Sequence, residues 1–111
     1  MILFNVSIAA SASYTTTQLT DNTHNNEKPQ ISNNGHVVWF GNYENSDNEI
    51  FSYNGLIILR LTNNDYEDLN PQINSNGHVV WRGFDGSDWE IFYAVPLNRA
   101  MPFIPLLLLN D

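Results

Sequence analysis

A nine-residue phrase occurs twice in this chain of 111 residues and constrains the fold more than any other feature. The stretch NNGHVVWFG begins at Asn33, and SNGHVVWRG begins at Ser75. The match extends over residues 18–41 and 60–83, and it resumes after a one-residue deletion as Ser-Asp-x-Glu-Ile-Phe. Self-similarity at a fixed period of 20–50 residues is the signature of repeat architectures. The chain is therefore an internal duplication with a period of about 42 residues.

Each repeat is predicted to hold four short strands, which in the first repeat are residues 29–32, 36–40, 49–53 and 56–62. These runs are rich in β-branched and aromatic residues, and Asn-Gly pairs separate several of them. We expect Asn34-Gly35 and Asn76-Gly77 to form type I′ turns with positive φ at both positions. Four antiparallel strands in about 40 residues are typical of a β-propeller blade. The sequence therefore predicts an all-β fold of two four-stranded antiparallel β-propeller blades, a partial propeller, over about 18–59 and 60–95.

The repeat also resembles a known family. Its pattern is Leu-Thr, an Asn-rich acidic linker, Pro-Gln-Ile, Asn-Gly, His-Val-Val-Trp, Gly, Ser-Asp and Glu-Ile-Phe, over residues 15–93. It resembles the TolB-like, WD40-like propeller repeats of exported bacterial proteins and the propeller of dipeptidyl-peptidase-type proteins. The resemblance implies an interaction platform, a lectin or a non-catalytic partner of an enzyme. The departure is length, because this chain has two blades where members of the family usually have six or more.

Residues 14–20, YTTTQLT, align with residues 56–62, LIILRLT, the last strand of the first blade. The chain is thus expected to carry an orphan N-terminal outer strand, then a full blade, and then three strands of a second blade. Two blades cannot close a ring, so this strand would complete a neighbouring copy. We expect a homo-oligomer, a trimer or tetramer with six or eight blades. The alternative is that the ring is closed by missing blades of a longer protein.

The two ends of the chain differ from the repeats, which fill residues 13–95. Residues 1–12 contain a short apolar run and then Ala-Ser-Ala, which fits an export signal or its remnant, although a basic n-region is missing. An ordinary N-terminal strand or helix is the alternative. Residues 96–111 form an irregular apolar tail, too short to span a bilayer. We expect an exported protein, periplasmic or extracellular, without a membrane span.

Composition limits the classes of partner. The net charge of −8 repels phosphate, which disfavours nucleic acid and anionic membranes. The absence of cysteine excludes disulfides, thiolate catalysis and cysteine-zinc sites. No nucleophile elbow, phosphate-binding glycine loop or HExxH motif is present. We therefore expect a protein that is not an enzyme and has no cofactor.

The repeated residues Trp39 and Trp81 are interpreted as core, because a large aromatic within a Val-Val-Trp strand is usually buried. The alternative is a sugar-stacking platform. His36 and His78 follow the turn glycines Gly35 and Gly77, and we interpret them as strand-start residues. Metal binding by the two histidines together is the alternative, although a metal needs three or four converging ligands.

The best candidates for ligand contact are the large aromatic residues of the loops, with the repeated aspartates beside them: Tyr43, Phe84, Trp89, Asp47 and Asp88. We expect the aspartates to bond main-chain N–H groups in their turns. A calcium site in residues 85–90 is disfavoured because calcium needs six to eight oxygen ligands. Three functions remain: a non-enzymatic scaffold that binds protein, a lectin-like propeller that binds glycan, and an accessory domain of a hydrolase.

Overall fold

The computed structural model describes residues 12–44 and 46–97, and it is all-β over this part of the chain. The all-β prediction is therefore confirmed. The strands, in chain order, are β1 (Asn26–Ile31), β2 (Val37–Asn42), β3 (Asn48–Tyr53), β4 (Ile58–Arg60), β5 (Asp68–Ile73), β6 (Val79–Phe84) and β7 (Trp89–Ala94). None of the described residues belongs to a helix that is long and apolar enough to cross a membrane.

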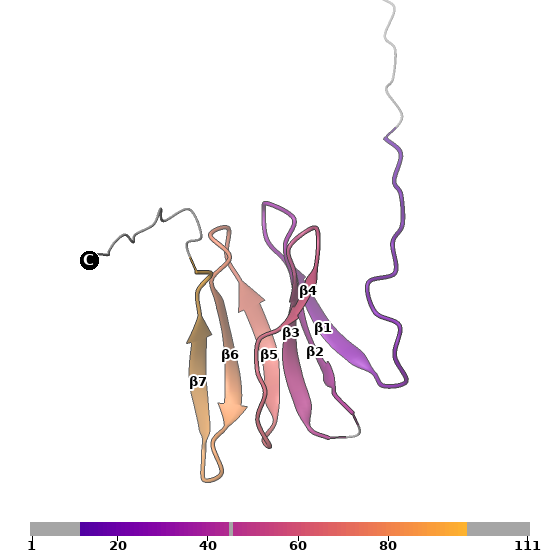
Figure 1. Cartoon of the computed structure of the whole chain (residues 1–111). Coiled ribbons are helices and arrows are strands. Elements are labelled where there is room, and N and C mark those ends of the chain that lie inside the picture. The colour runs from indigo at the N-terminus through magenta and orange to yellow at the C-terminus, as the bar shows by residue number, and fades with distance from the viewer. Residues whose placement is uncertain (1–11, 45, 98–111) are drawn as a thin grey trace, which may run out of the picture.

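The strands form two antiparallel sheets, and each sheet holds one copy of the sequence repeat (Figure 1). The first sheet has the order β1-β2-β3-β4 and the second has the order β5-β6-β7. Corresponding strands pair in the same register, since Trp39 lies opposite Phe51 and Trp81 lies opposite Phe92. A complete second blade would have a fourth strand, but the described residues form three strands there, as the strand count along the chain predicted. Its expected position falls mostly on residues 98–103, which lie outside the described residues, as do residues 1–11 of the expected export signal.

The expected N-terminal strand is not formed within the single chain. Residues 12–21 have no strand partner, and residues 12–18 are exposed. A strand exists only when another strand satisfies its backbone groups. The sequence comparison identified the strand-like segment, but the edge it would pair with is not available beside it in this chain.

The Asn-Gly turns differ from the expected type I′ geometry. Gly35 and Gly77 have φ of 87° and 80°, whereas neither Asn34 nor Asn76 has positive φ. In the first turn the Gly35 N–H donates to the Ser32 carbonyl over 3.0 Å, and the Ser32 N–H donates to the His36 carbonyl over 2.8 Å. This is the pattern of a three-residue hairpin loop, in which a type I turn is followed by a glycine bulge. The prediction of a hairpin was right and the turn type was wrong, because a third loop residue moves the positive φ onto glycine alone.

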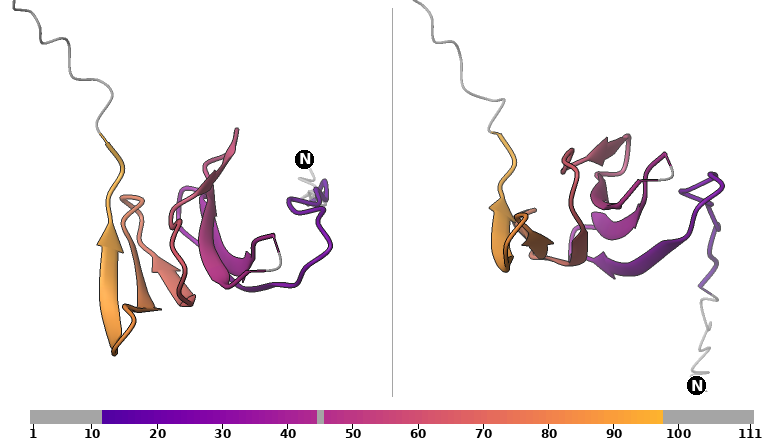
Figure 2. Two further views of the ribbon diagram at one scale, coloured as in Figure 1. Left: turned by 60° about the horizontal axis from the view of Figure 1, so that its bottom comes forward. Right: turned by 90° about the horizontal axis from the view of Figure 1, so that it is seen from below.

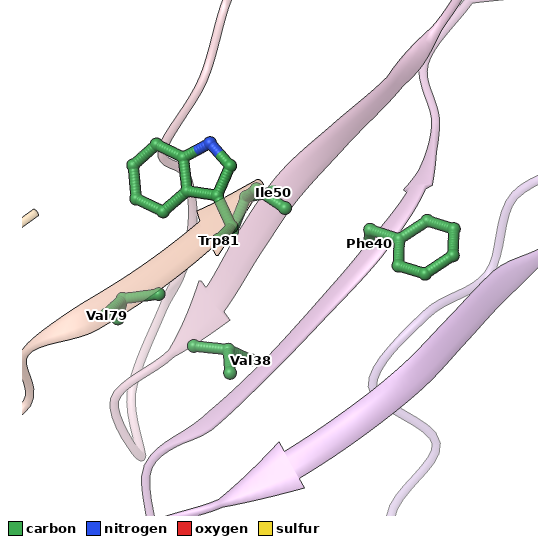
Figure 3. Packing of buried hydrophobic residues seen from close by; sticks show 5 residues of the cluster. All are labelled: Val38, Phe40, Ile50, Val79 and Trp81. Carbon is green, nitrogen blue, oxygen red and sulfur yellow. The ribbon is translucent and has the colours of Figure 1, made fainter. Parts of the chain in front are cut away.

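The two sheets pack face to face around a small apolar core (Figure 3). The core residues are Val38, Phe40 and Ile50 of the first sheet with Val79 and Trp81 of the second. Alternation along a strand places residues i and i+2 on the same face. In the repeat alignment, however, Val38 corresponds to Val80, which is not in the core. The sheets therefore pack head to tail, with one face of the first repeat against the opposite face of the second.

We call the packed faces the inner faces. The outer face of the second sheet consists of Val80, Arg82 and Phe84 of β6 with Trp89, Ile91 and Tyr93 of β7. The outer face of the first sheet carries Val37 and Trp39 of β2 with Phe51 and Tyr53 of β3. Figure 2 shows the second sheet fanning away from the first, with β7 farthest from the N-terminal segment.

Candidate functional site

The two repeated tryptophans are buried, with exposed fractions of 4% for Trp39 and 7% for Trp81. The burial expected for both residues is confirmed. The Trp81 Nε1–H donates to the buried carboxylate of Asp68 over 2.8 Å, between the two sheets. Trp39 lies on the outer face of the first sheet, where it stacks on Phe51 with ring centres 6.0 Å apart. A buried ring offers no open face to a sugar, so neither tryptophan is placed to act as a stacking platform.

The outer side of Trp39 is covered by the N-terminal segment. Leu19 and Thr20 line a shallow hollow together with Trp39 and Pro29. Trp39 Nε1 is buried without a hydrogen-bond partner among the described residues. The segment thus shields this indole, although it does not supply the acceptor that Asp68 gives to Trp81.

The two repeated histidines do not converge. His36 lines an apolar hollow of about 220 Å³ between the sheets, beside Gly77. A Cβ on Gly77 would lie 3.1 Å from a carbon of Pro96, which is a tight contact, and 3.9 Å from His36 Nδ1, which is an ordinary contact distance. His78 has its ring against Tyr93, and its Nδ1 is 2.8 Å from the Tyr93 hydroxyl. Among the described residues, no three His, Cys, Asp or Glu side chains gather as metal ligands.

The aromatic candidates separate into two clusters. Phe84 and Trp89 pack edge to face on the outer face of the second sheet, with ring centres 5.6 Å apart. The Arg82 guanidinium lies over the Trp89 ring at 4.3 Å, and Tyr66 packs on Phe84 at 5.8 Å. Trp89 remains 44% exposed.

Tyr43 belongs to the other cluster, at the edge of the first sheet. The Arg60 guanidinium lies over the Tyr43 ring at 3.9 Å, and Phe51 is 6.4 Å from that ring. The structure therefore unites Phe84 with Trp89 but does not bring Tyr43 to them. An arginine over an aromatic ring is a cation–π pair, worth about 0.5–1 kcal/mol at an exposed site.

The repeated aspartates Asp47 and Asp88 were expected to accept hydrogen bonds from main-chain N–H groups. In the second repeat a different aspartate, Asp85, accepts these bonds. Its Oδ1 accepts from the N–H groups of Ser87 at 2.8 Å and Asp88 at 2.9 Å. These bonds hold the pKa of the Asp85 carboxyl below its usual range. In the first repeat Ser46 donates its hydroxyl to Asp47, whose Oδ2 is buried without a partner among the described residues. Asp47 and Asp88 therefore lie in their turns without a shared ligand geometry.

A buried polar cluster that sequence reasoning missed joins the two sheets. Glu49 of β3 accepts a hydrogen bond from the Thr62 hydroxyl and one of 3.3 Å from the Asn64 N–H. The Ile50 N–H donates to the same Thr62 oxygen over 2.9 Å, and the Asn64 side chain donates to Asp68 over 2.9 Å. We call Glu49, Thr62, Asn64 and Asp68 the Glu49 cluster. The sequence held a signal, since Leu-Thr and Glu-Ile-Phe both recur in the repeat. Their recurrence does not show, however, that Thr62 and Glu49 lie in contact.

Burial raises the pKa of the Glu49 carboxyl above its ordinary value of 4.5. Its bonds from Thr62 and Asn64 act in the opposite direction, and the charges of Asp68 and Asp47 raise the pKa further. Glu49 is 2% exposed, so desolvation of the charged form is the main cause. A buried carboxylate that is held by neutral donors fits a structural joint between the sheets.

The most unusual surface is the outer face of the second sheet. Ile91 is 77% exposed, whereas Ile50, its counterpart in the first repeat, is fully buried. Val80 is 38% exposed and its counterpart Val38 is fully buried. The same repeat positions therefore form a core in one sheet and an open apolar face in the other, and exposed apolar patches mark association surfaces.

Comparison with family models, with curated proteins and with solved structures finds no match to this chain.

Proposed function

We propose that this chain supplies two neighbouring blades of a β-propeller and acts as a binding scaffold that catalyses no reaction. The exposure of Ile91 carries the proposal. At this repeat position the first sheet buries an isoleucine completely under the second sheet, and the second sheet leaves its isoleucine open. An open face that keeps the valine and isoleucine of a packed face, with Arg82 in place of Phe40, is suited to receive a further sheet.

The stacking order supports the same function. The inner face of the first sheet and the inner face of the second are opposite faces of the repeat, so the contact is heterologous. A heterologous contact can be repeated indefinitely or until it closes into a ring. Sheets that carry apolar residues on both faces are those that are buried on both faces. The scaffold then presents the loops between its strands to a partner outside the stack.

Association through the outer face of the second sheet is tested with Ile91→Asp and a matched control, Leu56→Asp. Leu56 is 88% exposed in the turn after β3, away from this face. We expect the parent and Leu56→Asp to associate in analytical ultracentrifugation and Ile91→Asp to remain monomeric and folded. Association that is unchanged in Ile91→Asp, or a parent that is monomeric at every concentration, contradicts the proposal.

Carbohydrate binding is the second candidate, because Trp89 is 44% exposed beside Phe84. Exposed aromatic rings can stack on the apolar faces of sugars, although Arg82 already covers one face of this ring. A glycan array probed with the parent and with Trp89→Ala decides this candidate: signals that depend on Trp89 support it, and an empty array rejects it. Export is part of the scaffold proposal, and sequencing the N-terminus of the protein recovered from its host tests it.

A further inference from the structure

We infer that residues 16–20 of one copy add to β7 of a second copy as its fourth strand. This inference deepens the proposed function and rests on it, because it names the partner of the open sheet as another copy of this chain. The argument uses the first sheet and its junction with the second as an internal template.

The template is the pairing of β4 with β3. Arg60 lies opposite Phe51, Leu59 opposite Ser52 and Ile58 opposite Tyr53. Beyond β4, the Leu61 N–H donates to the Ile50 carbonyl over 2.7 Å, and the Thr62 hydroxyl donates to the Glu49 carboxylate. Leu61 also packs against the core that contains Trp81. The Leu-Thr pair therefore completes one sheet and at the same time covers the tryptophan of the next.

β7 has the edge that corresponds to β3, and no strand of residues 12–44 and 46–97 pairs with that edge. It is the last strand of its sheet among the described residues. Glu90, the counterpart of the buried Glu49, is exposed, and so is Ile91 next to it. Within the described part of the chain, no segment therefore covers the acceptor or the edge on which the template depends.

The N-terminal segment provides the other half of the template. Leu19 and Thr20 correspond to Leu61 and Thr62 in the repeat. They line a shallow hollow together with Trp39, the counterpart of Trp81, and Leu61 packs against the core that contains Trp81. Residues 12–18, which correspond to β4 and the turn before it, are exposed and belong to no sheet. The end of the segment that holds Leu19 and Thr20 therefore lies beside its own first sheet. The part that corresponds to β4 pairs with no strand among the described residues.

A second copy is required because the segment and β7 lie at opposite ends of the molecule. Figures 1 and 2 show the N-terminal segment beyond β1 and β7 at the far side of the second sheet in every view. Both sheets lie between them. In the proposed contact, the outer face of the second sheet of one copy packs on the outer face of the first sheet of another copy. This repeats the contact between the two sheets within one chain.

The template fixes the register between copies. Gln18 is expected opposite Phe92, Thr17 opposite Tyr93 and Thr16 opposite Ala94. The Thr20 hydroxyl then donates to the Glu90 carboxylate and accepts from the Ile91 N–H. Three or four copies joined in this way would give six or eight sheets, within the range of closed propellers.

Two further positions are consistent with this contact, and one departs from it. His36 approaches Gly77 across the existing junction, and the counterpart of Gly77 is Gly35, where a Cβ would meet nothing within 4 Å. His78 of the neighbouring copy fits there. The hydrogen bonds from Asn48 to Glu67 have no counterpart, because Trp89 and Asn25 occupy those positions. The junction between copies is therefore expected to be weaker than the junction within the chain.

Cysteine pairs test the register directly, since the chain contains no cysteine. Directly opposed residues in antiparallel strands have Cα atoms about 4.5–5.5 Å apart, within the range for a disulfide. Thr17→Cys with Tyr93→Cys is the test pair. Ser52→Cys with Leu59→Cys is the matched pair within the first sheet, and Ser13→Cys with Tyr93→Cys is four residues out of register.

On mild oxidation we expect the test pair to form chain-to-chain disulfides, seen as a ladder on a non-reducing gel, while the matched pair links within one chain. The out-of-register pair should stay unlinked. A test pair that forms no disulfide, or that links only within one chain, overturns the inference. If association still depends on Ile91 but the test pair does not link, the proposed function stands and this inference fails.

Thr20→Val and Thr62→Val provide a second measurement that does not depend on oxidation. Thr62→Val removes a buried bond within the chain and should lower the melting temperature of the dilute monomer. Thr20→Val should leave that temperature unchanged and weaken association at least several-fold in ultracentrifugation. Association that is equally strong in Thr20→Val and the parent contradicts the role of the Thr20–Glu90 bond and, with it, the register.

Discussion

The two sheets carry two copies of one sequence repeat, yet they differ in what surrounds them. Ile50 and Glu49 of the first sheet are buried, and their counterparts Ile91 and Glu90 are exposed. The local structure is the same in both, since the strands pair in equal register. The difference teaches that burial at these positions depends on the neighbouring sheet and not on the strand itself.

On the outer face of the first sheet, burial again depends on the neighbouring sheet, but here the residue of the first sheet is the exposed one. Pro71 is fully buried against the first sheet, and its counterpart Pro29 is exposed. Trp39 is nevertheless as well buried as Trp81, because the N-terminal segment lies over it. That segment takes the place of a preceding sheet at one position only.

The largest difference between the sheets is expected from Ile50→Ala and Ile91→Ala. The first change leaves a cavity in the core and should lower the free energy of unfolding by about 2–5 kcal/mol. The second removes an exposed side chain and should change it by less than about 0.5 kcal/mol in the dilute monomer. Urea denaturation of both variants measures the two values. Equal losses would show that the outer face of the second sheet is covered within a single chain.

A smaller difference is expected from Trp81→Phe and Trp39→Phe. Both changes remove similar apolar volume, but only Trp81 donates a hydrogen bond, to the buried Asp68. Losing the donor leaves one oxygen of Asp68 unpaired, which costs about 1–3 kcal/mol. Trp81→Phe should therefore be the more destabilising change by about that amount in urea denaturation. Asp68→Asn offers a control. In the Trp81→Phe background it should lower the free energy of unfolding much less than it does in the parent.

The sequence predicted the sheets better than it predicted the surfaces. The duplication and the β-branched runs located all seven observed strands, because local pattern determines strand formation. The exposure of Ile91 could not be derived in this way, since Ile91 and Ile50 lie in the same Glu-Ile-Phe motif. The Glu49 cluster escaped because its members come from β3 and from the connection after β4, and only tertiary packing brings these together. The turn type was wrong because Asn-Gly fits several hairpin loops, and the number of loop residues decides among them.

A still smaller difference is expected at the hairpin turns from Asn34→Ala and Asn76→Ala. The Asn34 side chain donates to the Ser75 carbonyl over 3.1 Å, from the turn of one sheet to the turn of the other. Because this bond is exposed, its loss should cost about 0.5 kcal/mol, near the lower limit for a hydrogen bond. Asn76 lies in the turn that has no third sheet beside it among the described residues, so Asn76→Ala should not affect the dilute monomer. Asn76→Ala should slightly weaken the association between copies. If Asn76→Ala destabilises the monomer as much as Asn34→Ala does, the comparison is contradicted.

The smallest effect concerns pH and separates Glu49 from Glu90. Burial raises the pKa of Glu49, so between its ordinary value of 4.5 and its value in the folded protein the folded state binds more protons than the unfolded state. Stability contributed by this residue therefore falls as pH rises through that window and stays low above it. Glu49→Gln keeps an acceptor for Thr62 and removes the ionisation, so its stability relative to the parent should increase from about pH 4 to pH 7. The hydrogen bonds from Thr62 and Asn64 oppose the effect of burial, which keeps the change small. Glu90→Gln, at the exposed counterpart, is the matched control, and urea denaturation of both variants over the same range measures the change. A difference between Glu49→Gln and the parent that is constant with pH would contradict the raised pKa of Glu49.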